Sequence, residues 1–154
     1  MGLGFIKDIA IILGGIVALF TFINAILEYS RQGAQKRAEQ FVMLRRRLKE
    51  NPAFGNITAL LYDDNPELRN IEPQDKRDYL GLLEEVALLM NSRLIRPDVA
   101  HYMFGYYVTR CFRSVNFWEN IERDSIYWSL FHNFALSMIA EEKRFRYRKR
   151  RLHF

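Results

Sequence analysis

The side chains with potential for chemistry are few in this 154-residue sequence, and none of them forms a catalytic motif. The single cysteine, Cys111, lies between Arg110 and Arg113, whose charges would favour its thiolate. No base or oxyanion donor stands at a recognisable spacing from it, so we expect a buried structural thiol. His101 and His132 fall on predicted helices among aromatic residues and are interpreted as packed or hydrogen-bonded.

Two pairs of adjacent carboxylates, Glu84-Glu85 and Glu141-Glu142, point to different helix faces and do not share a metal ion easily. A di-metal carboxylate site needs Glu-x-x-His on two helices, and neither copy is present. The sequence also lacks a phosphate loop, a nucleophile elbow and paired cysteines. We therefore expect a protein that is not an enzyme and holds no cofactor or metal ion, with an unfamiliar catalytic site as the minor alternative.

Residues 9–27, IAIILGGIVALFTFINAIL, form a long segment without a charge. As a helix, its 19 residues span roughly 28 Å, close to the ~30 Å hydrocarbon core of a bilayer. A buried helix of a soluble domain would show a polar stripe, but only Thr21 and Asn24 are polar here. A cleavable leader is the other alternative. Because the segment continues without a break into a helix-compatible stretch, we expect a transmembrane anchor.

Basic residues are much denser after this segment than before it. Lys7 stands alone before it, whereas seven basic residues lie between positions 31 and 49. The positive-inside rule predicts an N-terminus outside and a C-terminal domain in the cytoplasm, which suits an unpaired thiol. The juxtamembrane residues that set this topology are Arg31, Lys36, Arg37, Arg45, Arg46 and Arg47.

Small residues at Gly14, Gly15 and Ala18 lie on one side of the anchor. Such a face lets two transmembrane helices approach closely, and Asn24 is able to hydrogen-bond across that interface. The competing interpretation is that small residues occur there by chance and that Asn24 reaches the headgroups.

Charge divides the rest of the chain into three segments. Residues 28–49 carry seven basic and two acidic side chains, residues 50–142 carry eight and fifteen, and residues 143–154 carry seven and none. We therefore divide the chain into an anchor (1–28), a basic juxtamembrane helix (29–50), an acidic helical domain (51–142) and a basic tail (143–154).

The basic tail would attract anionic lipid headgroups, an acidic surface of a partner protein, or nucleic acid. A solvated terminus without a ligand is the fourth interpretation, and the neighbouring bilayer favours lipid. The candidate binding residues are Lys143, Arg144, Arg146, Arg148, Lys149, Arg150 and Arg151.

Apolar residues after the anchor recur at spacings of three and four, which predicts helices and no strands. The first helix is expected to continue to Asn51 through apolar positions that include Phe41, Val42, Leu44 and Leu48. Further helices are expected from Pro52, from Pro73 to about Asn91, from Pro97, and from about Ile121. The predicted fold is all-α: one N-terminal transmembrane helix followed by a small cytosolic helical bundle.

Eleven aromatic residues fall between positions 102 and 134. We expect most of them in the core, because a small domain needs large apolar side chains. The others would form an exposed patch for a partner.

Several short motifs carry a resemblance to a known family: LLEEVALLMN at 82–91, LI at 94–95, FGYY at 104–107 and NFW at 116–118. With the preceding anchor, they resemble small bacterial membrane proteins that are grouped as a domain of unknown function. The resemblance implies one N-terminal transmembrane helix, a compact helical cytosolic domain and a location in the bacterial inner membrane. It implies no activity and no site residues.

The sequence as a whole predicts a non-enzymatic, single-pass membrane protein. We expect an accessory or interaction subunit of a membrane protein complex, whose cytosolic domain docks on another membrane protein or on itself. The alternative is a membrane-tethered nucleic-acid-binding or regulatory module that uses residues 143–151.

Overall fold

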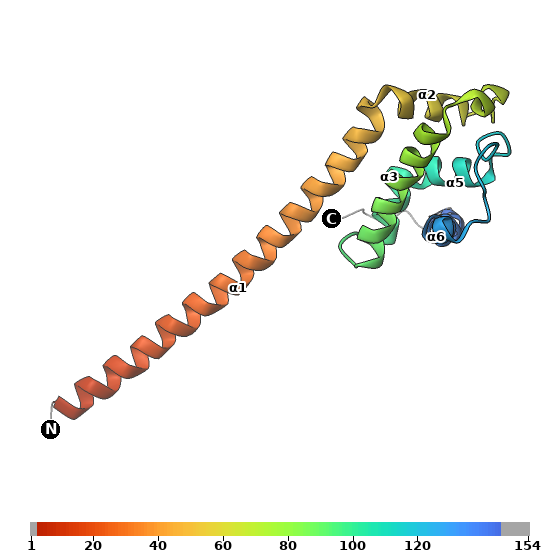
Figure 1. The fold of residues 1–154 in the computed structure, drawn as a ribbon. Helices are drawn as coiled ribbons and strands as arrows, with labels where there is room; N and C mark the ends of the chain where they lie inside the picture. The colour runs from red at the N-terminus through yellow and green to blue at the C-terminus, as the bar shows by residue number, and fades with distance from the viewer. Residues whose placement is uncertain (1–2, 146–154) are drawn as a thin grey trace. The chain divides into compact units, whose positions relative to one another are not determined.

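The computed structural model describes the backbone of residues 3–145 and the side chains of residues 11–29, 31–33 and 35–144. Every regular element in this range is helical and none is a strand, which confirms the all-α prediction for the described residues. Figure 1 shows the order of the helices along the chain. The chain divides into two units, Met1–Arg37 and Ala38–Phe154.

Helix α1 (Leu3–Glu50) provides the whole regular structure of the first unit and enters the second at Ala38. The side chains from residue 11 to residue 29 are all exposed. By length and composition, α1 is able to cross a membrane. The hydroxyl of Thr21 donates a hydrogen bond to the carbonyl oxygen of Val17, 2.8 Å away, within the same helix.

The second unit begins with the last turns of α1, which bury the apolar stripe Phe41, Leu44 and Leu48 as predicted. Val42, which we placed on the same stripe, is instead exposed, because it lies one position beyond Phe41 and faces away from the core. Asn51 then ends α1, and its side-chain oxygen accepts a hydrogen bond from the backbone N–H of Ala53 at 2.9 Å. This cap starts helix α2 (Pro52–Leu60) where the sequence predicted it.

Helix α3 (Pro73–Asn91) begins and ends where the sequence predicted. It follows a short 3-10 turn, η1 (Pro66–Asn70), which we did not expect. Its buried side includes Tyr79, Leu83 and Val86.

The single helix that we expected from Pro97 is interrupted in the structure. It consists of α4 (Pro97–Ala100), a π-helical turn η2 (His101–Gly105) and α5 (Tyr106–Arg113). A Cβ atom on Gly105 would lie 2.6 Å from Cδ2 of His101, so an alanine there would force the imidazole ring or the turn to shift.

Helix α6 (Ser129–Phe145) begins later than the predicted start at about Ile121, which was wrong. The guanidinium of Arg123 donates to the carbonyl oxygen of Phe112 at 2.8 Å and stacks on the ring of Trp118. Residues 121–125 are not helical and include a turn at 123–124, and the short 3-10 turn η3 (Ile126–Trp128) then leads into α6.

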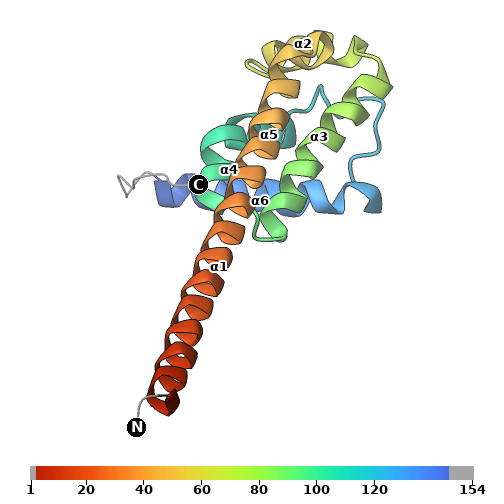
Figure 2. The same ribbon diagram turned by 90° about the vertical axis from the view of Figure 1, so that its left-hand side faces the viewer.

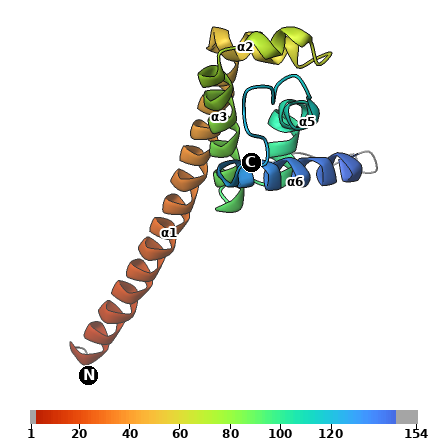
Figure 3. The ribbon, with the colours of Figure 1, turned by 45° about the vertical axis from the view of Figure 1, so that its right-hand side comes forward.

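Helix α6 packs against α3 and α5 and runs crosswise to α3 (Figures 2 and 3). Five of the eleven aromatic residues between positions 102 and 134 are buried here, three are half-buried, and three are exposed. The exposed ones are Tyr102, Tyr106 and Tyr127. The three half-buried residues pack against the core, so eight of the eleven contribute to it, and the three exposed residues are all tyrosines.

Candidate functional site

The small-residue face of the anchor lies on an exposed part of α1. Gly14, Gly15 and Ala18 are all exposed, and a Cβ added to either glycine would meet no atom within 4 Å. Packing within the helix therefore does not require glycine at these positions. Contact of this face with a second helix remains a prediction.

The first three topology residues have side chains available to solvent. Arg31 and Lys36 are exposed, and Arg37 is half-buried. Their positions suit the headgroup region that would follow the apolar segment.

The next two topology residues have structural contacts in the second unit. Nη1 of Arg45 contacts the sulfur of Met103, and Nε of Arg46 pairs with Glu50 at 2.8 Å. These two arginines therefore have contacts in the folded second unit, and they also belong to the excess of basic residues that predicts the topology.

The adjacent carboxylates of α3 do point to different faces. Glu84 accepts a hydrogen bond at 3.1 Å from the backbone N–H of Phe131, in the first turn of α6, and thus caps that helix. Burial raises the pKa of Glu84, and this hydrogen bond partly opposes the shift. Glu85 instead pairs at 2.8 Å with Arg47, the last of the topology residues.

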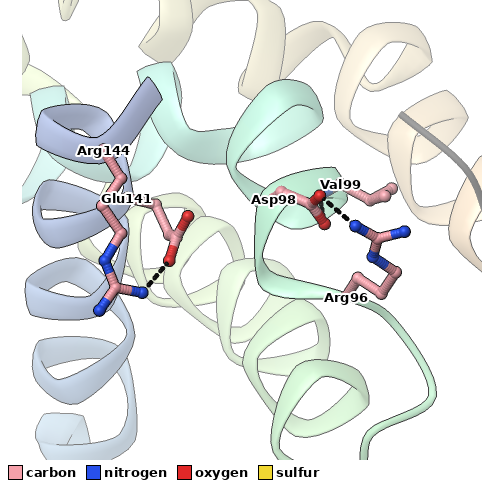
Figure 4. Close-up of polar contacts among 5 residues, drawn as sticks. All are labelled: Arg96, Asp98, Val99, Glu141 and Arg144. Carbon is pink, nitrogen blue, oxygen red and sulfur yellow. Dashed lines mark hydrogen bonds and ion pairs between the residues drawn. The ribbon is translucent and has the colours of Figure 1, made fainter. Parts of the chain in front are cut away.

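The described part of the basic tail is the C-terminal end of α6. Lys143 and Arg144 are exposed, and Arg144 pairs at 3.0 Å with Glu141 one turn earlier (Figure 4). Figure 4 also shows the ion pair of Arg96 with the buried Asp98, at 2.6 Å, at the start of α4. The predicted binding residues Arg146, Arg148, Lys149, Arg150 and Arg151 lie outside the described residues.

The thiol of Cys111 is fully buried, as expected. Burial raises its pKa, although the nearby charge of Arg123 opposes the shift, so the thiol is held protonated and unreactive. His132 packs edge-to-face against Phe112 and Trp118, with ring centroids 5.6 and 5.8 Å apart. The indole N–H of Trp118 donates to the carbonyl oxygen of Cys111 at 3.1 Å, so the cysteine and this histidine both contact Trp118.

A carboxylate clamp joins two loops that are 50 residues apart in sequence. Asp64 has a left-handed backbone with φ 51°, and its carboxylate accepts hydrogen bonds from the hydroxyl of Ser114 and from the backbone N–H groups of Val115 and Asn116. Its carbonyl oxygen accepts a 2.6 Å bond from the side chain of Asn116. Burial raises the pKa of Asp64, but these hydrogen bonds outweigh it and leave the pKa below the ordinary value. Sequence reasoning treated this aspartate only as part of a loop.

A buried lysine, Lys76, also escaped sequence reasoning because it lies in the polar first turn of α3. It is fully buried, and its ammonium group donates to the carbonyl oxygen of Glu119 at 2.8 Å. The ring centroid of Phe117 lies 6.0 Å from the same nitrogen. Burial lowers the pKa of Lys76, and the charge of Glu119 partly opposes this shift.

Two hollows in the surface of the second unit are candidates for binding. The first, which we call the α1/α3 groove, has a volume of about 320 Å³ and is lined by Gln40, Met43, Leu44, Arg47, Glu85, Leu88 and Leu89. The second, the π-turn cleft, has a volume of about 500 Å³ and is lined by His101, Tyr102, Gly105, Tyr106, Thr109, Arg110, Arg113 and Glu142.

Comparisons of the chain with protein-family models, curated proteins and solved structures found no match. Within the described residues, no group of three or more His, Cys, Asp or Glu side chains is placed to hold a metal ion. The described residues have an all-helical fold, and one helix is long and apolar enough to cross a membrane.

Proposed function

We propose that this chain is a single-pass membrane protein that serves as an interaction subunit of a membrane protein complex. The proposed architecture is a transmembrane anchor followed by a small cytosolic helical bundle. The observation that carries the proposal is the exposed apolar surface of α1, where Ile11 and Phe20 expose 72% and 68% of their area. Burial of one such side chain is favourable by about 1.5–3 kcal/mol, so a row of them favours a lipid environment.

The polar groups of the anchor are compatible with lipid. Thr21 satisfies its hydroxyl on the carbonyl oxygen of Val17, so it brings no unpaired donor into the hydrocarbon region. Asn24 lies near the end of the apolar segment, where headgroups begin. An unbroken helix also satisfies the backbone groups between its ends, as a membrane span requires.

The proposed orientation places the N-terminus outside and the second unit in the cytoplasm, with the bacterial inner membrane as the location. The exposed basic side chains of Arg31 and Lys36, which follow the apolar segment, support this orientation.

A cysteine reporter tests the orientation. Glu72 is exposed at the start of α3, whereas the native Cys111 is fully buried and leaves a low labelling background. In a Glu72→Cys variant, a membrane-impermeant maleimide should label the chain only after the cells are lysed. Labelling in intact cells would contradict the orientation.

The interaction surface that we propose is the α1/α3 groove. Val42, Met43 and Leu88 are exposed on the surface of the second unit to 53%, 57% and 55%, and two of them line this groove. Neighbouring exposed apolar side chains are typical of protein–protein contacts. The proposed partner is another membrane protein, because an anchored chain meets such partners within the same bilayer. The exposed Lys143 and Arg144 would add contacts to anionic headgroups or an acidic partner.

Affinity capture of the tagged full chain from native membranes, with copy numbers measured by mass spectrometry, tests the partner. We expect one membrane protein in equimolar amount, and its recovery should fall at least tenfold with Met43→Asp or Leu88→Asp. Leu136→Asp is the matched control, since Leu136 is also an exposed apolar residue but lies outside the groove. A stable monomer without a partner, or an equal loss in the control, would contradict the proposal.

A further inference from the structure

The π-turn cleft gathers cationic and aromatic side chains on one surface of an acidic domain. Thr109, Arg110 and Arg113 reach it from α5, and Glu142 reaches it from α6. The π-helical turn at residues 101–105 precedes α5 directly, and such turns inside helices frequently occur at functional sites. The local departure from α-helical geometry therefore coincides with a hollow lined by side chains that recognise anions.

Arg110 lies against two aromatic rings. Its guanidinium carbon is 5.9 Å from the ring centroid of Tyr62 and 5.5 Å from that of Tyr106. Within residues whose side chains the structure describes, it forms no ion pair. A guanidinium that stacks on aromatic faces keeps its fork of N–H donors at its edge, where an anion can accept two of them.

The second arginine of the cleft has only a loose partner. Arg113 and Glu142 are 3.7 Å apart, and their side chains expose 60% and 43% of their area. An ion pair with this exposure contributes little to stability, so an incoming anion can replace the carboxylate at low cost. The cleft thus offers two arginines against one carboxylate.

An excess of basic over acidic side chains, as in this cleft, is unusual for the domain, because residues 50–142 carry fifteen acidic and only eight basic side chains. Three other basic residues of the domain are engaged: Arg96 pairs with Asp98, Lys76 is buried, and Arg123 is bonded to a carbonyl oxygen. The two arginines of the cleft give an incoming anion a local cationic site on this acidic domain.

We propose that the π-turn cleft binds a phosphate-bearing anion, with Arg110 as the primary donor and Arg113 as the second. The planar guanidinium fork matches the tetrahedral oxygens of phosphate, and the exposed tyrosines Tyr102 and Tyr106 border the same hollow. The phosphate is either a soluble ion or part of a lipid headgroup. This site is separate from the α1/α3 groove, and it does not depend on the protein partner proposed there.

Three variants of the full chain separate this site from general electrostatic attraction. Arg110→Gln should weaken binding about tenfold or more, because a hydrogen bond to a charged group is lost. Glu142→Gln should strengthen binding about threefold, because a nearby like charge is removed. Arg77→Gln is the control: Arg77 is an exposed arginine of α3 outside the cleft, and its Nε donates to the side-chain oxygen of Gln74 at 3.2 Å.

In the first arm of the experiment, inorganic phosphate is titrated into the full chain in nanodiscs of neutral lipid, and binding is measured by calorimetry. The second arm uses nanodiscs that contain phosphatidylglycerol and counts the lipid retained on the chain by native mass spectrometry. Phosphate binding that changes in opposite directions in Arg110→Gln and Glu142→Gln assigns the site to a soluble anion. The site is assigned to a lipid headgroup if inorganic phosphate does not bind and phosphatidylglycerol is retained by the wild type and Arg77→Gln but not by Arg110→Gln. If neither probe depends on Arg110, or if Arg77→Gln causes an equal loss, the proposal is overturned.

Discussion

The carboxylate clamp of Asp64 should contribute a large and pH-dependent part of the stability of the second unit. It connects the loop after α2 with the loop after α5, so its loss releases two segments that are 50 residues apart. The test is a pair of substitutions, Asp64→Asn and Asp64→Ala. Asn can occupy the left-handed backbone conformation at this position, whereas Ala cannot do so without strain.

The magnitude follows from the contacts that each variant loses. Hydrogen bonds to a charged group contribute about 1.5–3 kcal/mol each, and an asparagine retains one acceptor oxygen. We therefore expect Asp64→Asn to lower the free energy of unfolding by about 2 kcal/mol. Asp64→Ala leaves the N–H groups of Val115 and Asn116 without this acceptor and adds backbone strain, so it should cost about 4 kcal/mol.

The contribution of Asp64 to the free energy of unfolding should decrease at acid pH. Because the folded-state pKa of Asp64 lies below its ordinary value, the carboxylate stabilises the fold above the unfolded-state pKa of about 3.9. This stabilisation is lost as the pH falls through the lower folded-state pKa, where the folded protein also takes up the proton. The difference between the wild type and Asp64→Asn should therefore be constant near neutral pH and shrink at acid pH.

Urea unfolding of the full chain in a mild detergent, followed by tryptophan fluorescence, provides the assay. Trp118 is buried close to the clamp in sequence and reports the transition. Asp63→Asn is the matched control, because Asp63 is the exposed neighbour of Asp64. Equal stability of the two asparagine variants, or a difference that does not shrink below pH of about 3.9, would refute the reasoning.

Three further predictions follow from buried or half-buried groups. Lys76→Met should leave the free energy of unfolding unchanged or raise it by up to about 2 kcal/mol, because it removes a buried charge. Urea unfolding at several pH values should also show the wild type gaining stability relative to Lys76→Met as the pH rises through the lowered pKa of Lys76. Gly105→Ala should cost about 1–3 kcal/mol, since its Cβ would lie 2.6 Å from the ring of His101, and a second substitution, His101→Ala, should recover part of that loss in thermal melts. A double-mutant cycle on Arg47 and Glu85 should give a coupling below about 1 kcal/mol, because both side chains are about half exposed.

Local sequence signals were sufficient for the helices that begin at a cap or a proline. Asn51 and Pro52 separate α1 from α2, and Pro73 starts α3, because these residues act through their own backbone and their immediate neighbours. The buried stripe through Phe41 and Leu44 followed from helical spacing in the same way.

Features that depend on distant contacts could not be read from the sequence. The late start of α6 reflects Arg123 on the carbonyl oxygen of Phe112 and the cap from Glu84, and neither contact has a local signal. The clamp of Asp64 joins residues on two separate loops, and Lys76 looks like any polar residue of a first helical turn. The π-turn cleft likewise requires α5 and α6 to be brought together.

Alkaline carbonate extraction of native membranes that contain the full chain tests the central proposal most directly. We expect the wild-type chain to sediment with the membranes, because residues 9–27 would lie in the hydrocarbon core. Leu19→Arg, which places a charge in the middle of that segment at a cost of about 2.5–3.5 kcal/mol, should shift the chain toward the supernatant. Release of the wild-type chain into the supernatant would contradict the account.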